Sequence, residues 1–269
     1  MEYFAVFEGF EPALKDVNLP IHEAIEKYIL SDLSSLRTKM EANLSPEAIS
    51  MLTRLARGDR KIHSVYKKES ISQGVGRSIY RQFFEDGVIS VEKSREIIPT
   101  LPPKVRRKKA LRGYKAEDKI HFRDSFTRFW FTFLSNHQDP LTCKAQIIEQ
   151  FEAYVGLAYE QLSLALLALH VKEPQILNQG SYWDRRHEID ILATLQDGRV
   201  IAGESKWKNR KVCKNILTSL QTKCAYAGLH VDCFALFSKS GFSKELLKNC
   251  DGNVWLFDID SFERLRDDR

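Results

Sequence analysis

The chain has 269 residues, enough for one large or two modest domains, and its 43% hydrophobic and 29% charged content is typical of a globular protein. A net charge of +5 is too small to indicate a nucleic-acid partner by itself. No apolar run approaches the ~20 residues that span a bilayer, and the N-terminus lacks the pattern of a signal peptide. The five cysteines show no C-x-x-C spacing. These features exclude a transmembrane helix and predict a cytoplasmic protein with reduced thiols and no membrane partner.

Residues 1–100 are predicted to form a mainly α domain. Its predicted elements are helices at 20–36, 45–58, 61–68 and 77–84 and a strand at 88–91. Ser45 is the N-cap of the second helix, because Pro46 follows it in the first turn. The order of the later elements predicts a winged helix-turn-helix, in which Arg77 and Arg81 would face a DNA groove. The alternative is an ordinary helical subdomain with a solvated basic face.

Residues 101–142 are predicted to hold a basic linker and an aromatic joining helix. The linker, 102–119, carries eight lysines and arginines against two acidic residues, and its two prolines predict a loop or wing. Such a segment can neutralise DNA phosphates without reading sequence, or it can simply be a solvated loop. The residues that we expect to contact phosphates are Arg106, Arg107, Lys108 and Lys109. Aromatic residues at helical spacing predict a buried helix over 123–135 that packs the two halves together.

Residues 143–269 are predicted to form an α/β domain. Periodicity and turn residues give the order helix, strand, strand, strand, helix, strand. The predicted elements are a helix at 145–169, strands at 176–183, 188–194 and 200–206, a helix at 212–227, a strand at 231–237, a short helix at 243–249 and a strand at 254–257.

The second and third of these strands carry charge where an apolar residue is expected. Asp190, Glu204 and Lys206 lie in strands that otherwise read as buried, where unpaired charges are costly. A two-residue turn at Asp197–Gly198 would place Asp190 and Glu204 on opposite faces of the hairpin. A three-residue loop at 196–198, with Gly198 left-handed, would pair them directly. We expect the three-residue loop, because it gathers both carboxylates and the ammonium group.

A cluster of two carboxylates and a lysine suits a hard divalent cation. Mg²⁺ is usually held by one or two carboxylates together with water and phosphate oxygens. Such a metal acidifies a bound water and neutralises charge on a phosphodiester, and Lys206 could orient that water or help to deprotonate it. The alternative is a structural ion pair that closes one end of the sheet.

The pattern Asp-x(13)-Glu-x-Lys on two neighbouring strands resembles the PD-(D/E)XK nuclease superfamily. More narrowly, YWDRRHEIDILA followed by IAGESKW resembles the nuclease-like C-terminal region of archaeal-type ATPases, over roughly 147–258. The resemblance implies an αβββαβ restriction-endonuclease-like core, Mg²⁺ or Mn²⁺ as cofactor, and DNA as substrate. Ile189 stands in place of the motif proline, and Ser205 stands where these relatives more often carry cysteine. The chain lacks a phosphate-binding G-x-x-x-x-G-K-[ST] motif, so an ATPase would have to be a separate partner.

By this resemblance Asp190 and Glu204 are metal ligands, Lys206 is the catalytic lysine, and Glu160 in the first core helix is a further ligand. Glu160 could equally be paired with a lysine or arginine. Further candidates are the phosphate contacts Arg185, Arg186 and Lys208 and, secondarily, Gln221 and Lys223 in the helix after the third strand.

The sequence therefore favours a metal-dependent DNA endonuclease, with a homodimer as a further possibility. The alternative is a non-catalytic DNA-binding or regulatory protein that retains the nuclease fold.

Overall fold

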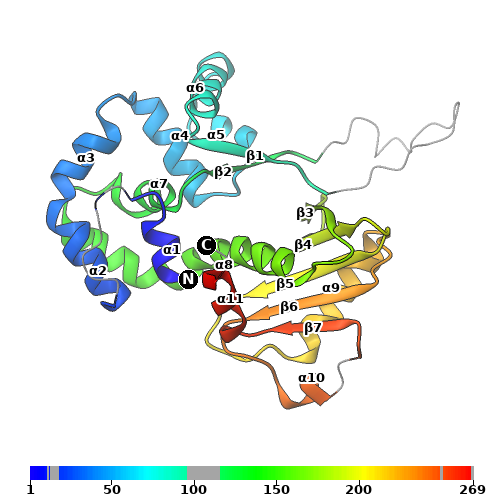
Figure 1. The fold of residues 1–269 in the computed structure, drawn as a ribbon. Coiled ribbons are helices and arrows are strands. Elements are labelled where there is room, and N and C mark those ends of the chain that lie inside the picture. Colours follow the sequence, from blue (N-terminus) through cyan, green and yellow to red (C-terminus); the bar gives the residue numbers. More distant parts are fainter. Residues whose placement is uncertain (11, 13–17, 96–115, 249–250, 268–269) are drawn as a thin grey trace, which may run out of the picture. The chain divides into compact units, whose positions relative to one another are not determined.

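Two compact units make up the chain. The computed structural model describes residues 1–10, 12, 18–95, 116–248 and 251–267 (Figure 1). The first unit comprises Met1–Glu92 and Asp118–Ala158, and the second comprises Lys93–Glu117 and Tyr159–Arg269. The first is mainly helical, and the second contains a mixed five-stranded sheet with helices, so the fold is α/β overall.

The first unit begins with short helices. In chain order the α-helices that lie wholly in it are α1 (Glu2–Phe7), α2 (Ile21–Tyr28), α3 (Leu33–Glu41), α4 (Pro46–Arg57), α5 (Ile62–Lys68), α6 (Gln73–Glu85) and α7 (Ser125–Phe129). The single helix expected over 20–36 is interrupted by a 3-10 turn, Leu30–Asp32. Ile29 and Leu30 are buried at this break, so the interruption accompanies core packing and has no Gly or Pro to mark it in the sequence.

Helix α4 begins where its sequence predicts. The Ser45 hydroxyl accepts a hydrogen bond from the Ala48 amide at 3.2 Å, and Pro46 occupies the first turn. Both features suit the exposed amides at a helix N-terminus. The apolar face of α4 is buried, with Met51, Leu52 and Leu55 in the core.

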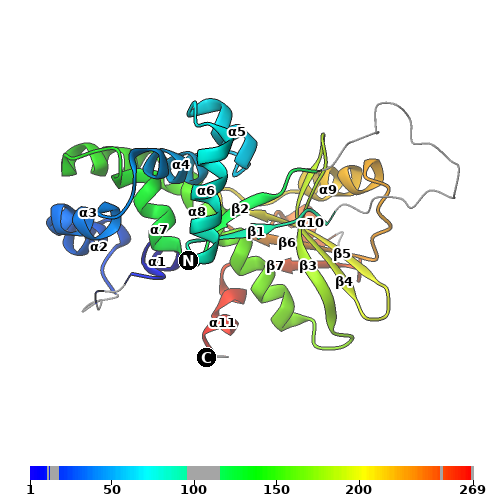
Figure 2. The same cartoon turned by 90° about the horizontal axis from the view of Figure 1, so that it is seen from above.

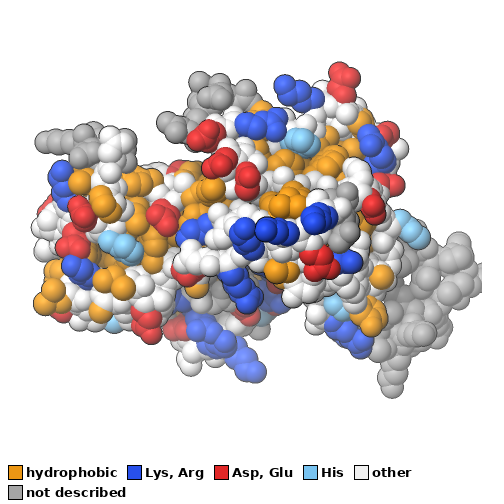
Figure 3. Space-filling view, turned by 90° about the horizontal axis from the view of Figure 1, so that it is seen from below, with side chains coloured by type: hydrophobic (Ala, Val, Ile, Leu, Met, Phe, Trp, Pro, Cys, Tyr) orange, Lys and Arg blue, Asp and Glu red, His pale blue; other side chains and the backbone are white. Residues whose placement is uncertain are grey.

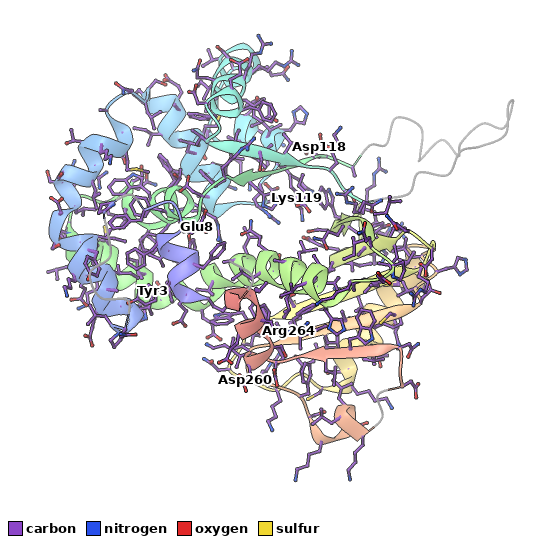
Figure 4. The ribbon with its side chains drawn as sticks, viewed as in Figure 1. Tyr3, Glu8, Asp118, Lys119, Asp260 and Arg264 are labelled. Carbon is purple, nitrogen blue, oxygen red and sulfur yellow. The ribbon has the colours of Figure 1, made fainter. Side chains whose placement is uncertain are left out.

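Helices α5 and α6 are followed by a small sheet. Strand β1 (Ile89–Glu92) confirms the expected strand, and it pairs antiparallel with β2 (Lys119–Phe122). The linker prediction is wrong at its last residue, because Lys119 lies opposite Glu92 in β2 and is only 4% exposed. Figure 4 labels Lys119 at the start of this strand. Lys119 is therefore part of the folded unit and not of a solvated cationic loop.

The aromatic segment expected as one α-helix has two parts. After α7 the chain continues as a π-helix, η3 (Trp130–Leu134), and both parts belong to the first unit. The Arg37 guanidinium donates hydrogen bonds at 2.7 Å to the carbonyl oxygens of Leu134 and Ser135. It thereby satisfies acceptors that a helix terminus leaves without intrahelical partners.

Helix α8 (Pro140–His170) contributes residues to both units, and the sheet of the second unit follows it. Its strands are β3 (Ile176–Trp183), β4 (Glu188–Leu195), β5 (Val200–Lys206), β6 (Cys233–Ser238) and β7 (Val254–Phe257), in that spatial order. The first three are antiparallel neighbours, whereas β5, β6 and β7 are parallel. All five strands lie within two residues of their predicted bounds.

Helices cover both faces of this sheet (Figure 2). Helix α9 (Lys214–Tyr226) packs Leu217 and Leu220 on one face, in a cluster with Leu192 and Ala202. On the other face Tyr159 of α8 contacts Phe262 in the 3-10 turn η4 (Asp260–Glu263). The short helices α10 (Lys244–Lys248) and α11 (Arg264–Asp267) complete the unit.

Charges of both signs are mixed on the surface. On the face drawn in Figure 3, lysine and arginine side chains lie among acidic and hydrophobic ones, which agrees with the small net charge. In the described ranges, no helix combines the length and the apolar character needed to cross a bilayer.

Candidate active site on strands β4 and β5

The hairpin between β4 and β5 has the register that brings the two carboxylates together. Ile191 pairs with Gly203 and Thr194 with Val200. The Leu195 amide then donates to the Arg199 carbonyl at 2.9 Å, which leaves a three-residue loop at 196–198. Gly198 in this loop has φ +88°, the left-handed conformation that favours glycine. Continuing the register by one residue places Asp190 opposite Glu204, so the expected three-residue loop is confirmed.

The backbone ladder between β4 and β5 ends beside the site. Beyond the Ile191–Gly203 pair, a side-chain contact replaces the backbone pairing: Asp190 Oδ2 accepts a hydrogen bond from the Ser205 amide at 2.9 Å. A Cβ on Gly203 would lie 3.0 Å from the Ala235 carbonyl oxygen, so glycine permits the close approach of β6 at this point. The strand positions next to the site are thus fixed by the Asp190 carboxylate on the β4 side and by the backbone pairing with β6 on the other.

Glu204 is held between two ammonium groups. Lys206 Nζ lies 2.7 Å from Glu204 Oε1 and 3.6 Å from Asp190 Oδ2. Lys223 Nζ, from α9, lies 2.9 Å from Glu204 Oε2 and 3.1 Å from Oε1. The sequence marked Lys223 only as a secondary candidate, yet it makes two of the contacts to this carboxylate.

Burial perturbs the acid–base behaviour of these groups. Glu204 is 7% exposed, and burial together with the nearby Glu204 charge raises the pKa of Asp190 to about 6. Burial alone would lower the pKa of Lys206, but the Asp190 and Glu204 carboxylates outweigh it and raise that pKa above its ordinary value. The site therefore holds two partly buried carboxylates beside two ammonium groups, and Lys206 keeps its proton at neutral pH.

The donor set fits a hard divalent cation held by two carboxylates. Asp190 and Glu204 supply the oxygen ligands that Mg²⁺ prefers. Burial, and then the Glu204 charge, disfavour the ionised Asp190 carboxylate, which a bound cation would stabilise. Glu160 on α8 is half-buried, and its charge helps to raise the Lys206 pKa. Within the described ranges, no three His, Cys, Asp or Glu side chains already form a metal-binding group. Two carboxylates, with water and phosphate oxygens, are nevertheless sufficient for Mg²⁺.

The remaining candidates in the second unit lie at its surface. Arg185 and Arg186 are exposed on a turn whose amides, from Arg186 and His187, donate to Asp184 Oδ1 at 2.6 and 2.7 Å. Lys208 is exposed beyond the end of β5, and Gln221 is exposed on α9. The structure thus assembles Asp190, Glu204, Lys206 and Lys223, and it displays Arg185, Arg186, Lys208 and Gln221 on the surface.

The candidates in the first unit are only partly described. Arg77 and Arg81 are exposed on α6, while Phe83 on the same helix is 4% exposed and packs in the core, as expected for an amphipathic helix. Arg106, Arg107, Lys108 and Lys109 lie outside the described residues.

Lys239, at the end of β6, is a neighbour of the site that the sequence did not suggest. Its amide donates to the Lys206 carbonyl at 3.1 Å, and its ammonium group lies 4.4 Å from the centre of the Trp207 ring. Because the carboxyl ends of parallel strands meet at one edge of a sheet, the parallel pairing of β5 and β6 could have predicted this contact.

Comparison with known proteins gives one match. Residues 127–216 match the family DUF234, described as archaea bacterial proteins of unknown function. The matched stretch contains Asp190, Glu204 and Lys206, and the family description assigns no activity. No curated protein and no solved structure matches the chain significantly.

Proposed function

We propose that the protein is a metal-dependent DNA nuclease of the PD-(D/E)XK type, with Asp190, Glu204 and Lys206 at its centre. The observation that carries this proposal is the register that sets Asp190 against Glu204 beside Lys206. Buried acids with strongly shifted pKa values are enriched at functional sites, and the pKa of about 6 for Asp190 adds support.

The order of elements also supports a restriction-endonuclease-like core. Helix α8, strands β3, β4 and β5, helix α9 and strand β6 follow the αβββαβ order, with β5 and β6 parallel. The charged residues lie on the two central strands of this arrangement, and α9 brings Lys223 to them. The order and the position of the charges thus point to the same family.

Each residue has a distinct role in the proposed reaction. Asp190, Glu204 and Glu160 would hold Mg²⁺ or Mn²⁺, which supplies Lewis-acid polarisation of the scissile phosphate and a nucleophile at neutral pH. Lys206 carries a proton at Nζ, because its pKa is raised, so it donates hydrogen bonds to negatively charged oxygens. Lys223 donates two hydrogen bonds to Glu204 and would compete with the cation for this carboxylate.

The first unit would bind DNA. Helices α4, α5 and α6 followed by the β1–β2 pair have the order of a winged helix, with Arg77 and Arg81 exposed on α6. Further phosphate contacts are proposed for the basic residues of the linker and of the second unit, namely Arg106, Arg107, Lys108, Lys109, Arg185, Arg186 and Lys208. We further propose that this nuclease acts in the cytoplasm and that any ATP dependence comes from a separate ATPase partner.

Cleavage of supercoiled plasmid tests the proposal. The wild-type protein should nick the plasmid with Mg²⁺ or Mn²⁺ and not with EDTA, and Asp190→Ala should lose this activity. Glu188→Gln is the matched control, because Glu188 is an exposed carboxylate two positions earlier on the same strand. Nicking by Asp190→Ala at the wild-type rate would refute the assignment of the site.

The second candidate function is a DNA-binding protein without turnover. It is favoured by the two ammonium groups that already surround Glu204, because such a cluster can also be a structural ion network. Retardation of DNA in every metal, without cleavage in any, would support this function over the nuclease.

A further inference from the structure

A cavity of about 490 Å³ in the first unit has no role in the proposed nuclease site. Its wall is one face of α4, and two residues outside that helix complete it. The lining residues are Pro46, Ile49, Ser50, Thr53, Arg54, Arg57, Glu69 and Asn136. Its volume falls within the range of about 300–1,000 Å³ that is usual for small-molecule sites.

Helix α4 faces this cavity with its polar side. The lining positions from 46 to 57 recur every three or four residues, which places them on one helical face. The opposite face carries Met51, Leu52 and Leu55 into the core. In an ordinary amphipathic helix the polar face meets open solvent, whereas here it lines a hollow.

Two polar groups of this wall are buried without a partner. Among the described residues, Thr53 Oγ1 and Arg54 Nε have no hydrogen-bond partner, and Thr53 is only 8% exposed. A buried polar atom left without a hydrogen bond destabilises the folded state. Most such atoms in folded proteins are paired, so a ligand bound in this cavity would supply partners that these two atoms lack.

The charges of the wall favour an anion. Arg54 and Arg57 face one acid, Glu69, and Glu69 Oε2 already accepts a hydrogen bond from the Ser50 hydroxyl at 2.6 Å. Arg57 Nε donates to the Thr132 carbonyl at 2.6 Å, which fixes the guanidinium in place. Burial lowers the pKa of Arg57, so its charge has lost part of its hydration. A guanidinium fork held this way matches the oxygens of a phosphate or carboxylate.

We propose that the α4 cavity binds a small anionic ligand through a phosphate or carboxylate group. Arg54 and Arg57 would pair with the anion, and the Thr53 hydroxyl would donate to one of its oxygens. This site lies wholly in the first unit and does not depend on the nuclease proposal.

Titration with two probes tests this site. Inorganic phosphate and succinate are added separately at constant ionic strength, while the thermal midpoint of unfolding is followed. We expect a saturable rise in the midpoint with at least one probe, and the one that acts identifies the group recognised. Arg54→Met should weaken the apparent affinity at least tenfold. Arg123→Met is the matched control, because Arg123 is exposed in the same unit and outside the cavity, and it should bind like wild type.

A second variant keeps the test decisive if Arg54→Met does not fold. Thr53→Val replaces the hydroxyl with a methyl group of similar size, so it should raise the midpoint of the free protein and at the same time weaken probe binding. An equal effect of the probes on wild type, Thr53→Val and Arg54→Met would show nonspecific anion binding and overturn the proposal. The absence of any midpoint change with either probe would also overturn it.

Discussion

The β4–β5 site and the α4 cavity are both polar, but their polar groups are paired to different degrees. At the β4–β5 site the charges satisfy one another, since Glu204 contacts both Lys206 and Lys223. In the α4 cavity Thr53 Oγ1 and Arg54 Nε are without partners among the described residues. A cation at the first site must therefore compete with ammonium groups, whereas an anion at the second meets unpaired donors.

The two kinds of binding site should differ in their stability without a ligand. A cluster that is internally paired is stable without its ligand, and its affinity depends on how easily the pairs rearrange. A cavity with unpaired groups reduces stability until a ligand fills it. Substitutions at the β4–β5 site can show whether it behaves as a rearrangeable cluster or as a fixed structural ion network.

Loss of the Lys206 charge should have the largest effect. Lys206→Met should lower the rate of metal-dependent plasmid nicking by about 100- to 1,000-fold, because a positioned donor to developing negative charge is removed. Lys214→Met, an exposed lysine on α9, should nick at the wild-type rate. Equal nicking by both variants would place Lys206 outside the reaction and leave a structural network.

The ionised Asp190 carboxylate should destabilise the metal-free protein at neutral pH. Asp190 has a pKa near 6 when folded and an ordinary value of 3.8, so its ionisation destabilises the fold as pH rises between these values. In EDTA at pH 7, Asp190→Asn should therefore be more stable than wild type by roughly 1–3 kcal/mol. The asparagine oxygen can still accept the Ser205 amide hydrogen bond.

Urea unfolding of the two proteins from pH 4 to pH 7 measures this difference. The stability gain should be near zero at pH 4, grow through pH 5 and level off above pH 6. A loss of stability that is constant with pH would instead identify Asp190 as a structural residue.

Much of the second unit follows from its sequence, and the reason is local. The hairpin register is set by a three-residue loop with glycine in the left-handed region, β4 alternates in character, and β5 begins as an apolar run. The first unit is harder to predict. Strand β2 pairs with β1 across a long sequence separation, so its short run, Lys119–Phe122, resembles the end of a basic linker.

The sequence also did not predict the contacts that residues outside the motif make with the site. Lys239 comes to the end of β5 through the parallel pairing of β6, which no single segment reveals. The contact between Lys223 and Glu204 likewise depends on how α9 packs over the sheet, and the sequence pattern alone does not show that packing.

Lys223 offers a smaller test of competition for Glu204. Lys223→Met removes one ammonium group from Glu204, so a divalent cation should meet less competition, and the Mn²⁺ concentration for half-maximal nicking should fall about 3- to 10-fold. Lys214→Met on the same helix is the matched control and should leave this concentration unchanged. A rise in the required Mn²⁺ would mean that Lys223 holds Glu204 in its metal-binding orientation.

The smallest expected effect concerns α6. Replacing Arg77 and Arg81 together with glutamine should weaken DNA binding to a similar degree on any duplex, because both are expected to bind phosphates. The slope of log affinity against log salt should become shallower by about 0.9 for each phosphate that the variant no longer neutralises. Arg123→Gln controls for a change in net charge, and an unchanged slope in the double variant would remove α6 from the DNA interface.

Direct binding of Mn²⁺ tests the central claim most closely. Calorimetric titration of the wild-type protein, freed of metal beforehand, should show one tightly bound Mn²⁺ per chain. Asp190→Asn and Glu204→Gln should each weaken that binding at least tenfold, while Glu188→Gln should bind like wild type. If Asp190→Asn and Glu204→Gln both bind Mn²⁺ as the wild type does, or if the wild type binds none, the two carboxylates do not form a metal site.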